Sequence, residues 1–152
     1  MVVGPQLNPH TDGYSQSYIF DVKRDRSGGR PLQTRWCEAS YNNNNCYTIS
    51  FGEAQNKKIR IRKNGPVEAD IEIGMVIPTT EFSTFIVDFE YDVSGLEIRV
   101  RSAYNPQPLV SWLDSQDQHS IRWVRIVCCC PSDMGGHGGS THLTIHKLRR
   151  LR

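Results

Sequence analysis

Residues 58–73 have the sequence KIRIRKNGPVEADIEI, in which apolar and charged side chains alternate on both sides of an Asn-Gly-Pro turn. Alternation with a period of two is typical of β-strands that bury one face. A three-residue loop gives both strands a common apolar face and sets opposite charges across from each other on the other face. The resulting cross-strand pairs are Arg62 with Glu68, Arg60 with Asp70, Lys58 with Glu72, Ile61 with Ala69 and Ile59 with Ile71. This stretch therefore predicts an antiparallel hairpin.

Residues 85–100 predict a second hairpin, closed by the turn Asp-Val-Ser-Gly at residues 92–95. Its apolar face pairs Tyr91 with Leu96, Phe89 with Ile98 and Val87 with Val100, and its other face pairs Asp88 with Arg99, Ile86 with Arg101 and Glu90 with Glu97. The two glutamates have no cation between them, which is unfavourable unless solvent screens them or something binds there. We expect screening by solvent at a sheet edge.

Strand-like segments continue along the whole chain, at residues 18–22, 34–39, 47–51, 109–113, 121–127 and 142–148. Turn signals separate them about every 8–12 residues, a spacing that leaves no room for βαβ crossovers. No stretch of a dozen residues has a helical period of 3.6. The sequence therefore predicts an all-β protein, an antiparallel β-sandwich of the jelly-roll or galectin type with about ten strands. At 152 residues it is expected to be a single domain over residues 1–152.

The charge is segregated along the chain although its sum is only +2. Residues 64–98 contain eight acidic side chains and no lysine or arginine, so the rest carries +10. Because the first hairpin pairs many of these charges across its strands, we do not expect the protein to bind nucleic acid or another polyanion. Such binding is an alternative function, because the tail at residues 147–152 is basic. No apolar run approaches the roughly 20 residues that a membrane span needs. The first residues lack the pattern of a secretory signal, so the compartment stays open.

The five cysteines are an odd number, so at least one thiol is free or pairs between chains. Cys37 and Cys46 flank an asparagine-rich hairpin tip and are candidates for a disulfide. Cys128, Cys129 and Cys130 have no recognisable base or orienting group that would make one of them a nucleophile.

A glycine-rich C-terminal loop carries residue types that bind metals, namely Asp133, His137, His142 and His146. On a strand, however, residues four apart stand about 13 Å apart, too far to share an ion. The sequence also has no pattern of a strand followed by a glycine-rich loop and a helix, the unit that binds nucleotides. We therefore expect no metal, no cofactor and no catalytic residues.

Polar and planar side chains suited to sugars occur at loops and on one predicted sheet face. Sugar hydroxyls need bidentate Asp, Asn or Arg partners, and the apolar face of a sugar stacks on an aromatic ring. The candidate ligand-binding residues are Trp36, Arg99, Arg101, Asn105, Trp112 and Asp114. Since tryptophans are also common in hydrophobic cores, the alternative for Trp112 is that it is a core residue and does not contact a ligand. The pattern favours a non-catalytic module that binds glycans or glycoproteins.

Residues 47–52 (YTISFG), followed by Asn56 and residues 59–62 (IRIR), resemble the invertebrate domain family named after farnesoic acid O-methyltransferase. Further similar positions are Phe82 and Phe85, residues 95–100, residues 108–114, and Ile121 with Val124. The resemblance covers residues 47–127 and implies a compact β-sandwich of extracellular and defence-related proteins. The family's name implies a methyltransferase, which is an alternative function, although no donor pocket is visible.

The strand content is also similar to that of galectin-type lectins, without their His-Asn-Arg and Trp-Glu-Arg sugar constellation. We therefore expect a lectin-like recognition protein. Exposed edge strands would offer it a route to a homodimer.

Overall fold

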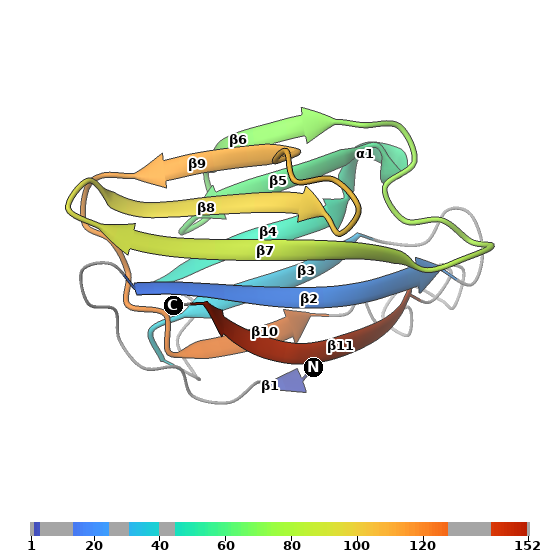
Figure 1. Ribbon diagram of the computed structural model, residues 1–152. Coiled ribbons are helices and arrows are strands. Elements are labelled where there is room, and N and C mark those ends of the chain that lie inside the picture. Colours follow the sequence, from blue (N-terminus) through green and yellow to red (C-terminus); the bar gives the residue numbers. More distant parts are fainter. Residues whose placement is uncertain (1, 4–13, 25–30, 40–44, 128–140, 152) are drawn as a thin grey trace.

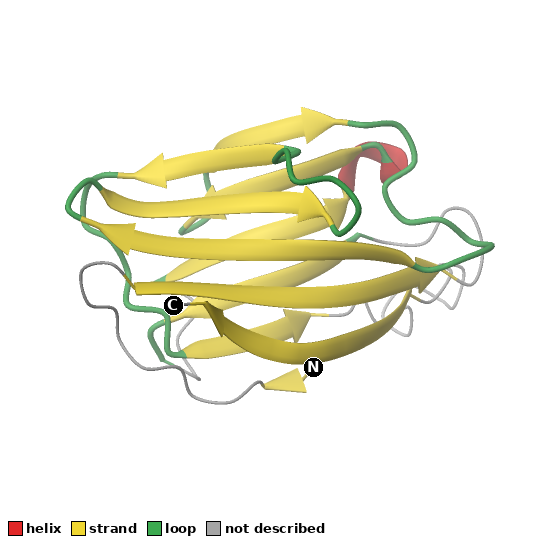
Figure 2. Ribbon diagram, viewed as in Figure 1, coloured by secondary structure: helices red, strands yellow, loops and turns green. Residues whose placement is uncertain are grey.

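The computed structural model describes residues 2–3, 14–24, 31–39, 45–127 and 141–151. Most of this part of the chain is β-strand, and the strands form two antiparallel sheets packed face to face (Figure 1). Figure 2 shows how little of the described chain is helical. The predicted antiparallel β-sandwich is confirmed. Within the described ranges, no helix is long and apolar enough to span a membrane.

Each sheet combines strands that are distant in sequence. The six-stranded sheet has the order β1 (Val2–Val3), β10 (Trp123–Val127), β3 (Leu32–Cys37), β4 (Cys46–Gly52), β5 (Lys58–Lys63) and β6 (Val67–Glu72). The five-stranded sheet has the order β11 (Thr141–Leu151), β2 (Tyr14–Arg24), β7 (Ser83–Asp92), β8 (Gly95–Ser102) and β9 (Val110–Asp114). The ten predicted strands are all present, with ends that shift by a few residues, and the short β1 is additional.

The core lies between the sheets and is centred on Trp36, which is fully buried. Its ring lies 4.6 Å from the ring of Tyr18 and 4.7 Å from that of Phe89, measured between centroids. Its Nε1 donates a 2.9 Å hydrogen bond to Thr34, whose hydroxyl donates to the Ile49 carbonyl. The polar atom of the buried indole is therefore satisfied, as burial of tryptophan requires.

The β5–β6 hairpin has the predicted register over most of its length. Lys58 lies opposite Glu72, Ile59 opposite Ile71, Arg60 opposite Asp70 and Ile61 opposite Ala69. Beyond Ile61 a β-bulge shifts the pairing, so Arg62 faces Val67 and the predicted pair with Glu68 is wrong. The turn that follows contains Asn64 and Gly65 with positive φ values of 54° and 114°, a geometry that sequence alternation does not reveal.

The β7–β8 hairpin has the predicted register at every pair, including Glu90 opposite Glu97. The expected explanation of that pair is wrong, because both strands lie inside the five-stranded sheet. Arg99 lies between the two acids, with Nη1 2.9 Å from Glu97 and Nη2 3.0 Å from Glu90. Asp88 is paired instead with Arg101, the diagonal neighbour, at 2.8 Å. Side chains that reach diagonally thus neutralise the like charges.

Candidate functional site

The largest of three hollows described on the surface lies on the outer face of the six-stranded sheet. This β3–β5 hollow has a volume of about 410 Å³ and is lined by Gln33, Arg35, Thr48, Glu53, Arg62 and Asn64, among others. Along β3, Leu32, Thr34 and Trp36 are buried, so strand alternation turns the residues between them outward. The hollow is therefore built on the rigid strands of the sheet.

One row of outward side chains crosses the hollow. Arg35 of β3 lies opposite Thr48 of β4, and Thr48 lies opposite Arg62 of β5. Because these pairs are in register, the three side chains stand side by side.

Glu53 closes one side of the hollow and holds Arg62 in a bidentate ion pair. Arg62 Nη2 lies 2.9 Å from Glu53 Oε1, and Arg62 Nη1 lies 2.5 Å from Oε2. Arg60 Nη1 is 3.6 Å from the same carboxylate. Burial acts to raise the pKa of Glu53, but the hydrogen bond and charge of Arg62, helped by Arg60, outweigh it and hold the pKa below its ordinary value. The carboxylate is therefore ionised, and its position is fixed.

A left-handed turn, α1 (Glu53–Asn56), brings Glu53 to this place. Ala54, Gln55 and Asn56 have φ values of 52°, 61° and 65°, a conformation that costs free energy for residues other than glycine. Asn56 holds the turn by donating from Nδ2 to the Ile77 carbonyl at 2.7 Å and accepting from the Ile77 amide at 2.9 Å. Contacts with a segment 21 residues away thus maintain the strained turn.

Arg35 differs from Arg62, the other arginine that lines the hollow. Its guanidinium makes no hydrogen bond and no ion pair within the described part of the chain. The side chain is half-buried and lines the hollow. It is therefore available to a ligand.

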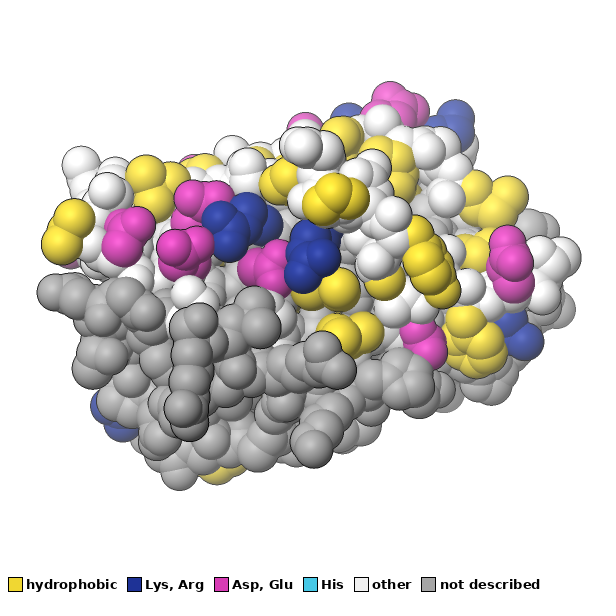
Figure 3. Space-filling view, viewed as in Figure 1, with side chains coloured by type: hydrophobic (Ala, Val, Ile, Leu, Met, Phe, Trp, Pro, Cys, Tyr) yellow, Lys and Arg dark blue, Asp and Glu magenta, His cyan; other side chains and the backbone are white. Residues whose placement is uncertain are grey.

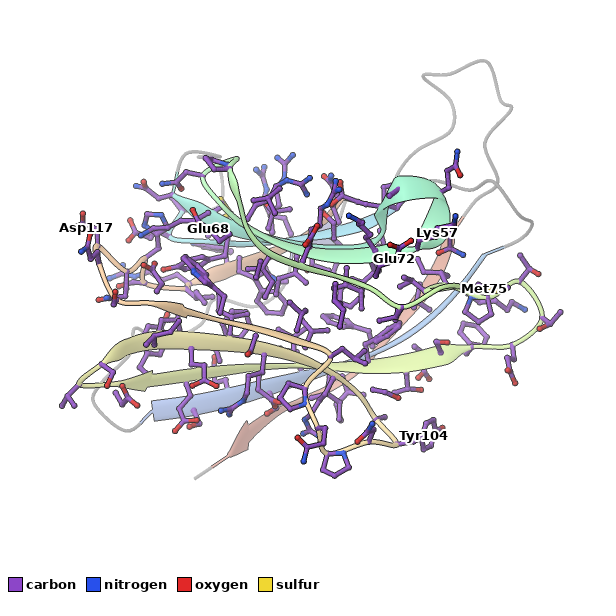
Figure 4. All side chains as sticks on the ribbon, turned by 90° about the horizontal axis from the view of Figure 1, so that it is seen from above. Lys57, Glu68, Glu72, Met75, Tyr104 and Asp117 are labelled. Atoms are coloured by element: carbon purple, nitrogen blue, oxygen red, sulfur yellow. A yellow bond between two sulfur atoms is a disulfide. The ribbon has the colours of Figure 1, made fainter. Side chains whose placement is uncertain are left out.

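A second hollow, of about 310 Å³, lies at the end of β9 and contains two of the predicted residues, Trp112 and Asp114. Asp114 is buried and already bonded, since it accepts from the Tyr47 hydroxyl at 2.6 Å and lies 2.8 Å from Lys63 Nζ. Trp112 is half-buried, with its ring 6.2 Å from that of Tyr47. Figure 4 shows two acids of this hollow, Glu68 and Asp117, toward the same end of the sandwich.

A third hollow, of about 370 Å³, contains the predicted residues Arg99 and Arg101 on the outer face of the five-stranded sheet. Figure 3 shows acidic side chains beside and between the basic ones on this face. Both guanidinium groups are paired with acids of β7 and β8. Asn105 lies exposed in the loop that follows β8, where its Oδ1 accepts from the Gln107 amide at 3.0 Å.

The structure does not bring the six predicted ligand-binding residues into one site. The prediction that Trp36 binds a ligand is wrong, because the alternation of β3 turns its side chain into the core. Arg99, Arg101 and Asn105 belong to the five-stranded sheet and its loop, whereas Trp112 and Asp114 lie at the β9 end. Sequence reasoning missed the β3–β5 hollow, although alternation along β3 was a usable signal for Gln33 and Arg35.

Cys37 and Cys46 form a disulfide between β3 and β4, as proposed from their positions. The other cysteines, and Asp133 and His137, lie outside the described residues. His142 and His146 belong to β11, whose side chains are not described. In the described part of the chain, no group of three or more His, Cys, Asp or Glu side chains could hold a metal ion.

Comparison with known proteins gives similarity in fold alone. No protein-family model and no curated protein sequence matches the chain, so the resemblance to the farnesoic acid O-methyltransferase family finds no support. A tetrameric galectin from the sponge Cinachyrella is similar with a TM-score of 0.60 and 12% identity, covering 99% of this chain and 100% of that one. The carbohydrate-binding module CBM66 from Bacillus subtilis has a TM-score of 0.56 and 13% identity, covering 94% and 84%.

Sheep galectin-11, solved in complex with glycerol, has a TM-score of 0.55 and 8% identity, covering 97% of this chain and 98% of that one. The chain thus has the galectin-like sandwich fold that lectins and a carbohydrate-binding module also have.

Proposed function

We propose that the protein is a carbohydrate-binding recognition module and that its sugar site is the β3–β5 hollow. The observation that carries the proposal is the bidentate pair of Arg62 and Glu53 beside Thr48. A charged donor and a hydroxyl on adjacent strands, with a charged acceptor held beside them by the turn α1, match the paired donors and acceptors of sugar hydroxyls. The volume of about 410 Å³ lies in the range of small-molecule sites.

The rigidity of the hollow supports this proposal. A site that is ordered before the ligand arrives loses less conformational entropy on binding. Thr48 and Arg62 project from paired strands. Glu53 is held by two guanidinium groups and belongs to a turn that is hydrogen-bonded to Ile77. The similarity in fold to galectins and to a carbohydrate-binding module adds to the case.

The partners expected for such a module are glycans or glycoproteins. The Cys37–Cys46 disulfide supports a compartment that is oxidising, because disulfides persist outside the reducing cytosol.

A glycan array that covers neutral and acidic classes, followed by calorimetric titration of the best binder, tests the proposal. Thr48→Val removes a hydroxyl from the hollow without disturbing an ion pair and should weaken binding about 3- to 10-fold, the effect of one hydrogen bond. Arg101→Gln, on the outer face of the other sheet, is the matched control and should bind like the unmodified protein. An array with no binding would overturn the proposal. Loss of binding in Arg101→Gln alone would move the site to the five-stranded sheet.

A further inference from the structure

We infer that the β3–β5 hollow recognises an acidic sugar and that the carboxylate or sulfate of this sugar binds at Arg35. The inference rests on the proposed function of the hollow and adds the chemical class of its ligand.

The first observation is a row of arginines across the six-stranded sheet. Arg125 of β10 lies opposite Arg35 of β3, and the same row continues through Thr48 to Arg62. Adjacent strands are about 4.8 Å apart, so the row crosses roughly 14 Å of sheet. Because the residue opposite Arg35 on β10 is itself an arginine, this neighbour in the row offers Arg35 no counter-charge.

The second observation is the distribution of counter-charges on this face. Glu53 is bound to Arg62 and lies close to Arg60, and Asp70 lies 3.5 Å from Arg60 and 3.4 Å from Lys58. Each of these three cations of β5 therefore has a carboxylate within ion-pair distance. Arg35, two strands away, has no acid of its own within the described residues. The unbalanced positive charge of the hollow is at Arg35.

The chemistry of the guanidinium selects the kind of anion. A half-buried arginine without partners has lost part of its hydration, and a ligand that accepts its hydrogen bonds restores what was lost. The planar fork of donors fits a carboxylate or a sulfate bidentately. Thr48, beside Arg35, is placed to bond a hydroxyl of the same sugar.

The acids of the face argue against a long polyanion. Glu53 lies in α1 beside β5, and Asp70 and Glu72 lie on β6, where a nucleic-acid backbone extending from Arg35 across the sheet would pass. Because Glu53 and Asp70 already occupy the cations of β5, this part of the face offers no row of unpaired cations to a chain of phosphates, whereas a sugar with one acidic group needs only Arg35.

The test uses two matched pairs of oligosaccharides in calorimetric titrations. One pair differs only in a terminal uronic acid and its carboxyl-reduced form, and the other differs only in one sulfate ester. At least one acidic member should bind 10- to 100-fold more tightly than its neutral partner, the range of a charge-assisted hydrogen bond. The pair that shows the preference identifies the anion as carboxylate or sulfate.

Arg35→Gln should reduce this preference to about 2-fold or less while the neutral partner still binds. Arg101→Gln should keep the preference, and a cooperative thermal transition in each variant would show that the fold is intact. Equal binding of acidic and neutral members by the unmodified protein would overturn the inference and leave the proposed function standing. Binding of single-stranded DNA that depends on Arg35, with no glycan bound, would overturn both.

Discussion

The Tyr47 hydroxyl of β4 donates a 2.6 Å hydrogen bond to the Asp114 carboxylate of β9, joining the two sheets at one end of the sandwich. The same hydroxyl accepts from the His119 amide at 2.9 Å, and Asp114 also lies 2.8 Å from Lys63 Nζ. Burial, together with the bond to Asp114, raises the pKa of Tyr47 well above its ordinary value. The phenol therefore stays protonated, and the link persists across the whole range of physiological pH.

Replacing Tyr47 with Phe should destabilise the protein by about 1–3 kcal/mol, because the change removes one hydrogen bond from the buried Asp114 and leaves the His119 amide without a partner. Urea unfolding measures the loss. Tyr104→Phe, at an exposed tyrosine, is the control and should leave the unfolding free energy unchanged. Equal stabilities of the two variants would show that the link contributes nothing.

His119 should make stability depend on pH. Burial lowers the pKa of this imidazole below its ordinary value of 6.5, and the attraction of Glu38 only partly opposes the shift. The unfolded chain thus binds a proton at a higher pH than the folded one does, so stability is fully present above pH 6.5 and falls as the pH drops below it. Urea unfolding at pH 7.5 and at pH 5 should show this decline, with a smaller decline in His119→Gln. A native state that gains stability over the same drop in pH would contradict the sign.

The left-handed turn at Ala54 should be more stable with glycine. Ala54 has a φ of 52° and is exposed, so Ala54→Gly relieves backbone strain without removing a buried contact. We expect a gain of about 0.5–1 kcal/mol in unfolding free energy. Lys57→Gly is the matched control, since Lys57 has a φ of −110° and is exposed, and it should lose stability. A loss in Ala54→Gly would mean that the turn is not strained.

The Cys37–Cys46 disulfide should contribute to stability through the unfolded state. It closes a short loop, with a sequence separation of 9, for which chain entropy gives about 2–3 kcal/mol. Reduction with a phosphine should lower the melting temperature of the unmodified protein. The double variant Cys37→Ala/Cys46→Ala should melt at a lower temperature, and reduction should not change it further. An unchanged melting temperature on reduction would rule out this contribution.

Sequence alternation predicted the fold well because burial on one face imposes a period of two. The pairs from Lys58 opposite Glu72 to Ile61 opposite Ala69 follow from that rule alone. The prediction failed at Arg62, where a bulge precedes a turn with positive φ. Bulges depend on backbone geometry and on contacts across the sheet, and neither is written in the apolar pattern.

The candidate site was harder to predict because it combines segments that no local pattern connects. Trp36 was selected for its residue type, although the alternation of β3 turns it inward and Arg35 outward. Glu53 belongs to a left-handed turn, residues 53–56, that contains no glycine. The turn is held by hydrogen bonds to Ile77, which is 21 residues further along the chain than Asn56. A sequence signal for that turn is absent, because residues other than glycine adopt it only when tertiary contacts enforce it.

Arg99 should stabilise the β7–β8 pair mainly by offsetting the repulsion between Glu90 and Glu97. Arg99→Gln leaves Glu90 opposite Glu97 without the cation that now lies 3.0 Å and 2.9 Å from them. Since these side chains are partly exposed, the expected loss in unfolding free energy is only about 0.5–1 kcal/mol at low ionic strength. The loss should shrink in 1 M NaCl, where charges are screened within about 3 Å.

A second substitution, Glu97→Gln in the Arg99→Gln background, removes the repulsion and should restore most of the lost stability, whereas Glu97→Gln alone should not stabilise the protein. If the double variant were less stable than Arg99→Gln, the arginine would act through packing of its side chain and not through charge.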